Sequence, residues 1–283
     1  MNQISQPRPP TPPIAKNIIA VASGKGGVGK TTVAVNLAIA LAQKGFTTGL
    51  LDADIYGPNV PMMTDTMEAR LDGTPQGRIK PIEKFGLRLV SIGYVSQGDT
   101  AVIWRGPLVG RMITQFLTEV EWGDLDYLIV DLPPGTGDAQ LTLSQAVALS
   151  GAVIVTTPQD VALSDAKKGI NMFRKVEVPV LGVIENMSYF SCPHCHQRTE
   201  IFSHGGGRAA AKKFEAPFLG EVPLHVAIRQ GGDEGRPIVT HTGAHAVKEA
   251  FDKIVDELLA QVKARRAGQD QEQSIIGKVF KLS

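Results

Sequence analysis

The chain has 283 residues, a formal net charge of +1 and a hydrophobic content of 43%. The near-neutral charge argues against a strongly basic surface for nucleic acid, and two cysteines are too few for a disulfide framework. No apolar run in the sequence reaches the length of a membrane span, and free thiols suit a reducing, cytoplasmic compartment.

The N-terminal segment 1–16 is rich in proline and has neither an apolar signal core nor the composition of a transit helix. We therefore expect a disordered leader there. The alternating apolar and amphipathic segments that follow predict one domain over 17–266, and a flexible tail is expected over 267–283.

The first predicted strand, 18–22, and the first predicted helix, 32–43, enclose a phosphate-loop pattern, GxxxxGK(S/T). Glycines let backbone N–H groups converge on phosphate oxygens, and the helix N-terminus favours negative charge. Lys30 would reach the β- and γ-phosphates and the Thr31 hydroxyl would bind Mg²⁺. A plain glycine turn or a dinucleotide-binding loop explains the pattern less well. The predicted phosphate-binding residues are Gly24, Lys25, Gly26, Gly27, Val28, Gly29, Lys30, Thr31 and Thr32.

Two aspartates, Asp52 and Asp54, follow the second predicted strand, 48–51. Ligands of open α/β sheets bind outside the carboxyl ends of the strands, so both side chains are expected near the phosphates. One of them could orient or deprotonate the attacking water. The alternative is a pair of solvated loop carboxylates.

A third aspartate, Asp131, ends the apolar strand predicted over 127–130. It is expected to hold Mg²⁺ through water, and the alternative is a loop or N-cap residue without a ligand. The Pro- and Gly-rich loop 132–138 that follows could sense the γ-phosphate as a switch.

The remaining predicted elements continue the alternation, which indicates a mainly parallel, doubly wound α/β sheet covered by helices on both faces. Segment 62–84 is expected to be a loop insertion, and 243–266 a long terminal helix. The apolar end of the tail, 275–282, could lie on a membrane, but folding back or disorder is favoured. Further strands are predicted over 87–92, 152–156, 180–184 and 218–222, and further helices over 108–120, 139–149 and 163–175.

The two cysteines, Cys192 and Cys195, stand in C-x₂-C spacing, which lets both thiolates meet one metal. A closed site needs four ligands, so two subunits at a two-fold axis would complete it. An iron–sulfur cluster and zinc both suit thiolate ligands, whereas a redox dithiol or two inert thiols are weaker alternatives. The neighbouring His194 and His196 are interpreted as loop polarity, and the glycines after His204 as a flexible loop.

The second lysine of the glycine loop, Lys25, carries a resemblance to a family. The loop is similar to the deviant phosphate loop of the dimeric ATPases that include the nitrogenase iron protein, MinD and ParA. Within that group the chain resembles the Mrp/ApbC branch of iron–sulfur cluster carriers. The segments that match are Asp52-Ala53-Asp54-Ile55-Tyr56-Gly57-Pro58-Asn59, Trp104-Arg105-Gly106-Pro107, Asp131-Leu132-Pro133-Pro134-Gly135-Thr136-Gly137-Asp138, Thr157-Pro158-Gln159-Asp160 and Glu185-Asn186-Met187-Ser188.

The resemblance implies roles for individual residues. Lys25 would reach the nucleotide of the partner subunit, Asp54 would position the hydrolytic water, and Asn186 would contact adenine. Segment 223–237 would flank the base, although His225 stands where many relatives carry aspartate.

For the whole molecule the resemblance implies a homodimeric, Mg²⁺-dependent ATPase with ATP between its subunits. It would assemble a [4Fe–4S] cluster on Cys192 and Cys195 of both subunits and pass it to apo iron–sulfur proteins. The alternative is a positioning or scaffold ATPase of the MinD/ParA type, with structural zinc at the cysteines.

Overall fold

The computed structural model describes residues 14–95, 106–135, 137–192, 194–195, 197–243 and 245–279. Several predicted features lie outside these residues: most of the proline-rich leader, the Trp104-Arg105 pair and the end of the tail beyond Val279. Thr136, Pro193 and His196 also lie outside them.

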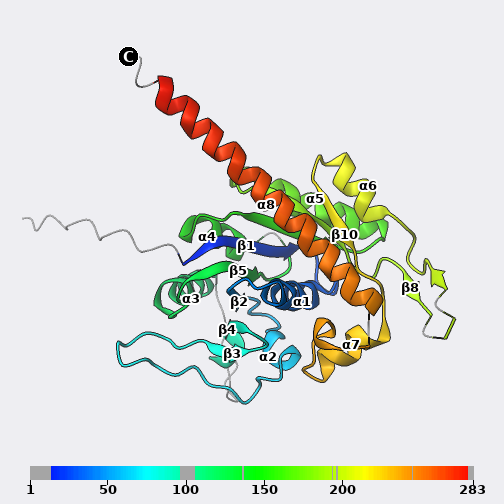
Figure 1. Cartoon of the computed structure of the whole chain (residues 1–283), viewed down its shortest axis with the longest axis horizontal. Coiled ribbons are helices and arrows are strands. Elements are labelled where there is room, and N and C mark those ends of the chain that lie inside the picture. The colour runs from blue at the N-terminus through cyan, green and yellow to red at the C-terminus, as the bar shows by residue number, and fades with distance from the viewer. Residues whose placement is uncertain are drawn as a thin grey trace, which may run out of the picture.

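The core of the described chain is an eight-stranded sheet with the order β10-β7-β6-β1-β5-β2-β4-β3 (Figure 1). Neighbouring strands pair in parallel except β3 and β4, which pair antiparallel. This confirms the predicted doubly wound, mainly parallel α/β sheet. The strands are β1 (Ala15–Ser23), β2 (Thr48–Asp52), β3 (Ile82–Lys84), β4 (Leu87–Ser91), β5 (Leu125–Asp131), β6 (Gly151–Thr156), β7 (Val180–Glu185) and β10 (Phe218–Glu221).

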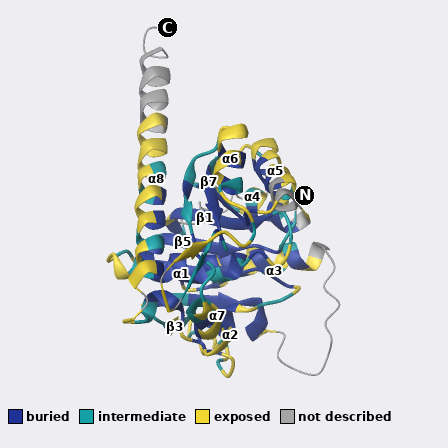
Figure 2. Cartoon of the chain, turned by 90° about the vertical axis from the view of Figure 1, so that its right-hand side faces the viewer, coloured by how far each residue is buried: buried dark blue, intermediate teal, exposed yellow. Residues whose placement is uncertain are grey.

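Helices cover both faces of the sheet, because its central strands are apolar on both sides. Helices α1 and α8 pack on one face, and α3, α4 and α5 pack on the other (Figure 2). Two separate groups of buried side chains result, one on each face. The helices are α1 (Lys30–Gln43), α2 (Val60–Met63), α3 (Gly106–Glu119), α4 (Asp138–Ala146), α5 (Asp160–Lys175), α6 (Gly206–Lys213), α7 (Val226–Asp233) and α8 (His245–Val279), with 3₁₀ turns at Ile92–Tyr94 and Ile238–Thr240.

The strand order indicates at which edge of the sheet a ligand would bind. β1 lies at the centre, between β5 and β6, and the chain leaves it in both directions. In sheets of this kind ligands bind where the winding reverses, outside the carboxyl ends of the strands. The ends of β1, β2, β5 and β7 therefore all face the same region.

Three segments differ from the prediction. The predicted loop 62–84 ends in the edge strand β3, and α2 precedes it, although both are too short to give a periodic signal. The glycines after His204 do not form a loop, because α6 begins at Gly206 and Gly205 adopts the left-handed conformation of its N-cap. A small hairpin of β8 (Phe190–Ser191) and β9 (Arg198–Thr199) was also not predicted.

The terminal helix α8 is longer than predicted and continues past Arg266 to Val279. Its first half packs against β10 and α1, with Phe251, Ile254 and Leu258 fully buried. Its second half projects from the body of the molecule (Figures 1 and 2). Among the described residues, no helix is both long and apolar enough to cross a bilayer.

Candidate functional site

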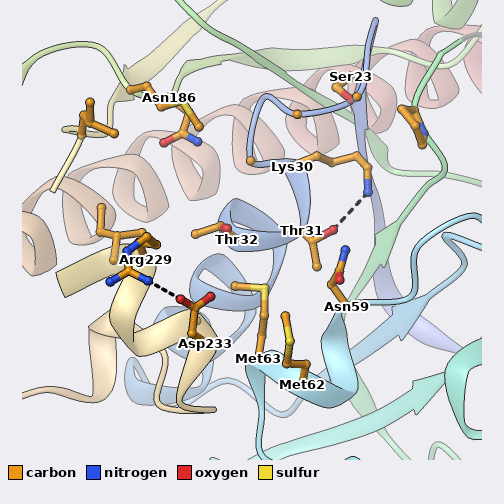
Figure 3. A pocket seen from close by; sticks show the side chains of 18 of the residues that line it. Ser23, Lys30, Thr31, Thr32, Asn59, Met62, Met63, Asn186, Arg229 and Asp233 are labelled. Carbon is orange, nitrogen blue, oxygen red and sulfur yellow. Dashed lines mark hydrogen bonds and ion pairs between the residues drawn. The ribbon is translucent and has the colours of Figure 1, made fainter. Parts of the chain in front are cut away.

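A cavity of about 390 Å³ opens at the carboxyl edge of the sheet (Figure 3). Lys30 and Thr31 of α1 lie beside Asn59 at one end of it, and Asn186 and Arg229 lie toward the other end. The predicted site residues that line the cavity are Gly26, Gly27, Gly29, Lys30, Thr31, Thr32, Asp54 and Asn186. Four other predicted site residues do not line the cavity: Gly24, Lys25, Val28 and Asp131.

The phosphate loop is held against the turn that follows β7. The Asn186 side-chain amide donates to the carbonyl of Val28 at 2.8 Å. Gly29 is left-handed, with φ of 76°, and a Cβ there would lie 2.2 Å from the Asn186 amide nitrogen. Only glycine satisfies both conditions, so the loop shape depends on Gly29 as well as on α1 behind it.

Lys30 is the buried cation of the site. Its Nζ lies 2.6 Å from Asp131 Oδ1, 3.3 Å from Asp54 Oδ2 and 3.4 Å from the Thr31 hydroxyl. Burial acts to lower the pKa of Lys30, but Asp131 and Asp54 outweigh that effect and raise the pKa above its usual value. Lys30 is therefore charged at neutral pH, as a phosphate ligand must be.

Asp131 lies at the end of β5 with no exposed surface. Its second oxygen accepts a hydrogen bond from the Thr31 hydroxyl at 2.7 Å. Burial raises the pKa of Asp131, and Lys30 opposes that shift. A hydroxyl and a carboxylate oxygen side by side are hard donors that fit Mg²⁺.

The structure separates the roles of Asp52 and Asp54. Asp52 is fully buried and accepts hydrogen bonds from the Ser91 hydroxyl at 2.8 Å and from the backbone N–H groups of Asp54 and Val60 at 3.1 and 3.3 Å. Burial, helped by the nearby Asp131, raises the pKa of Asp52 to about 7. Asp54 lines the cavity instead, so of the two it is the one that a ligand would meet.

Lys25 is a half-buried residue of the phosphate loop. Its backbone carbonyl accepts from the Ser23 hydroxyl at 2.9 Å, which fixes the start of the loop. Lys25 does not line the cavity that its own chain forms.

The far end of the cavity is built by Asn186, Met187 and α7 with the residues before it. His225 caps α7, because its Nδ1 accepts from the Ala227 N–H at 3.1 Å. Aspartate is a common N-cap for the same reason, so histidine preserves this local role. One turn apart on α7, Arg229 and Asp233 form an ion pair at the rim.

Asn59, Met62 and Met63 line the cavity but were not assigned a role from the sequence. They come from α2 and its N-cap, an element too short to show helical periodicity. The sequence signal is the matched segment 52–59, of which Asn59 is the last residue and which Met62 and Met63 closely follow.

The two cysteines lie on the connection between β8 and β9. Both are free thiols, Cys192 half-buried and Cys195 exposed, and the Cys192 N–H donates to the Gln197 carbonyl at 3.1 Å. Backbone hydrogen bonds from Cys195 and His194 lower the pKa of Cys192, which favours the thiolate that binds metals. Within the described part of the chain, no cluster of three or more His, Cys, Asp or Glu side chains is arranged for a metal.

Comparison with known proteins places this arrangement in a family. A family model described as ParA, NUBPL iron-transfer P-loop NTPase, matches residues 14–259. An iron–sulfur cluster carrier protein of Synechocystis is 53% identical over 251 residues, which cover 87% of this chain and 71% of that protein. The iron–sulfur cluster transfer protein NUBPL of Dictyostelium discoideum is 47% identical over 249 residues, covering 88% and 77%.

Solved structures show the same fold. A nucleotide-binding protein of Archaeoglobus fulgidus in complex with ADP superposes with a TM-score of 0.70 at 39% identity, covering 79% of this chain and 88% of that one. The cell division ATPase MinD of Pyrococcus furiosus gives a TM-score of 0.63 at 23% identity over 87% of this chain and 99% of its own, a likeness of fold. The chain therefore belongs to the NUBPL iron-transfer branch of the ParA P-loop NTPases, the family of the iron–sulfur cluster carriers.

Proposed function

We propose that this protein is a cytoplasmic ATPase that carries a [4Fe–4S] cluster between two copies of its chain and transfers it to apo iron–sulfur proteins. The observation that carries the proposal is the pair of free thiols on the β8–β9 connection. One chain presents two thiols there and, among its described residues, no third ligand group. Two chains would supply the four thiolates that such a cluster takes.

The nucleotide chemistry follows from the cavity. ATP would place its phosphates in the glycine loop, with Lys30 on the β- and γ-phosphates. Thr31 would hold Mg²⁺ directly and Asp131 through water, and the metal would neutralise phosphate charge. The related Archaeoglobus protein, whose structure is a complex with ADP, supports nucleotide binding by this chain.

Hydrolysis needs a positioned water and a stabilised leaving group. Asp54 would orient the water whose oxygen attacks the γ-phosphorus; the bond to the β–γ bridging oxygen breaks, and ADP and phosphate leave. Lys25 does not line the cavity of its own chain, which suits a cation that serves the partner subunit's nucleotide. It would act there as an arginine finger does in other phosphoryl transfers.

Anaerobic reconstitution of the wild type and of Cys192→Ala tests the proposal. The wild type is expected to turn brown, with iron and sulfide in the ratio of one cluster per dimer. Cys192→Ala should lose the cluster and keep its ATP affinity, because the cavity does not include that residue. Absorption spectra, metal analysis and sedimentation measure these quantities.

Two results would contradict the carrier function. A colourless protein with tightly bound zinc would favour a scaffold ATPase of the MinD/ParA type. A protein that stays monomeric with nucleotide and metal present could not hold the cluster between two chains.

A further inference from the structure

A buried carboxylate that has no part in the proposed chemistry lies next in the chain to the cavity-lining Asn186. Glu185 ends β7 and has no exposed surface. One of its oxygens lies 2.5 Å from the Ser188 hydroxyl, and the other accepts a hydrogen bond from the backbone N–H of Gly207. Burying a charge is costly unless it is hydrogen-bonded, so both contacts are needed.

These two contacts hold both ends of one segment. Ser188 comes two residues before the β8–β9 hairpin begins, and Gly207, the second residue of α6, follows the end of the hairpin in the chain. The segment between them, 189–206, contains Cys192 and Cys195. Backbone hydrogen bonds also hold the start of this segment. The Ser188 N–H donates to the Val222 carbonyl at 3.0 Å, and the Val222 N–H donates to the Glu185 carbonyl at 2.8 Å.

The start of α6 is shaped to admit this carboxylate. A Cβ on Gly207 would lie 2.9 Å from the Glu185 side chain, and a Cβ on Gly206 would lie 2.5 Å from the Pro158 carbonyl oxygen. The N-terminus of a helix also favours negative charge. The glycine run therefore serves close approach between α6 and the strand ends.

The same turn contacts the phosphate loop. Asn186, the next residue after Glu185, donates to the Val28 carbonyl and is fixed by its own N–H, which donates to the Thr156 carbonyl at 2.8 Å. Met187 adopts a left-handed conformation with φ of 54° and lines the cavity. A displacement of this turn by a nucleotide would reach Glu185 and Ser188 within one or two residues.

We propose that Glu185, Ser188 and Gly207 form a clamp that fixes the cysteine hairpin to the nucleotide cavity, so that nucleotide binding changes the mobility of segment 189–206. The clamp is a positioning device, and Glu185 touches neither ligand. The inference rests on the proposed function only in naming an iron–sulfur cluster as the group that the hairpin binds. The test below uses the cluster-free protein.

The test is hydrogen exchange of segment 189–206 in the cluster-free full-length chain, with and without Mg²⁺ and ATP. The variants are Ser188→Ala and Glu185→Gln, each of which removes one contact of the clamp. Thr48→Val is the matched control, because it removes a buried hydroxyl that donates to the Phe46 carbonyl at 3.0 Å at the far end of β2.

In the wild type, Mg²⁺ and ATP are expected to slow exchange in this segment. In Ser188→Ala and Glu185→Gln, nucleotide-free exchange should rise about tenfold, equivalent to about 1.4 kcal/mol, and the response to ATP should disappear. Their ATP affinity should stay within about threefold of wild type, since the altered atoms lie outside the cavity. Thr48→Val should keep the full response.

A wild type whose segment does not respond to ATP would overturn the clamp. So would a Ser188→Ala protein that binds ATP and keeps the full response, or a Thr48→Val protein that loses it equally. If Glu185→Gln does not fold, hydrogen exchange in Ser188→Ala is sufficient to test the clamp. Failure of the proposed function alone would give a different result. The wild type would bind no iron and sulfide, but hydrogen exchange in segment 189–206 would still respond to ATP.

Discussion

At the scale of single residues, Asp52 and Asp54 show how burial divides the work of similar side chains. Asp52 is committed to three hydrogen bonds beneath the surface, and one of them fixes the backbone of Asp54. Asp54 pairs with Lys30 and faces the cavity. The sequence identified both carboxylates as candidates, but only the fold shows which one has its hydrogen-bonding capacity already filled.

Asp52→Asn gives a prediction about pH. The pKa of Asp52 is raised to about 7 in the folded chain, from an ordinary value of 3.8. The folded state therefore keeps a proton that the unfolded state releases, and this contribution to stability is lost as the pH rises through 7. The free energy of unfolding of the wild type, relative to Asp52→Asn, should fall by about 3 kcal/mol between pH 5 and pH 8. Urea unfolding of both proteins across this range measures it, and parallel pH curves would contradict it.

At the scale of elements, the glycine loop and α1 act as one unit. Gly29 ends the loop and caps α1 in a left-handed conformation, and it lies against Asn186. Gly45, just after the other end of α1, is also left-handed, with φ of 92°, but has no atom within 4 Å of the position of a Cβ. The two glycines have different surroundings, but both have a left-handed backbone conformation that would be strained in any residue with a Cβ.

Gly29→Ala and Gly45→Ala should therefore separate strain from function. Both should lower the free energy of unfolding by about 1–2 kcal/mol, because alanine is disfavoured in this conformation. Only Gly29→Ala displaces Asn186 from the loop, so only it should weaken ATP binding, by tenfold or more. Urea unfolding and titration with a fluorescent ATP analogue measure the two effects. Equal loss of affinity in both variants would refute the role of the Gly29–Asn186 contact.

At the scale of the whole molecule, the proposed function requires a second copy of the chain. The copy would complete the ligand set of the two free thiols, and it would bring Lys25, which does not line its own cavity, to a nucleotide. If Lys25 acts on the partner's nucleotide while Asp54 acts on its own, the two residues serve the same reaction from different chains. Mixed dimers can distinguish this arrangement from one in which both act within one chain.

Lys25→Ala and Asp54→Ala should each lower ATP turnover by about 100-fold. Mixed in equal amounts, they should recover about a quarter of wild-type turnover, because half of the dimers are mixed and one of their two sites has both residues. Steady-state phosphate release measures turnover, with each variant alone as the control. No recovery on mixing, in dimers that are shown to exchange subunits, would place both residues in one chain.

The sequence by itself determined the sheet class, the phosphate loop and the candidate carboxylates, because their signals are local. The spacing of glycines, lysine and threonine within a few residues specifies a phosphate site, and continuous apolar runs specify buried parallel strands. Short or glycine-rich elements, such as α2, α6 and the β8–β9 hairpin, gave no periodic signal and were missed or taken for loops.

Only the tertiary structure decided which distant residues meet. Asn186 reaches Val28 across 158 positions of sequence, and Glu185 reaches Gly207 across 22. These contacts form because parallel strands bring their carboxyl ends to one edge, where buried polar groups must find partners. That requirement, which acts in space rather than along the chain, joins the phosphate loop to the cysteine hairpin.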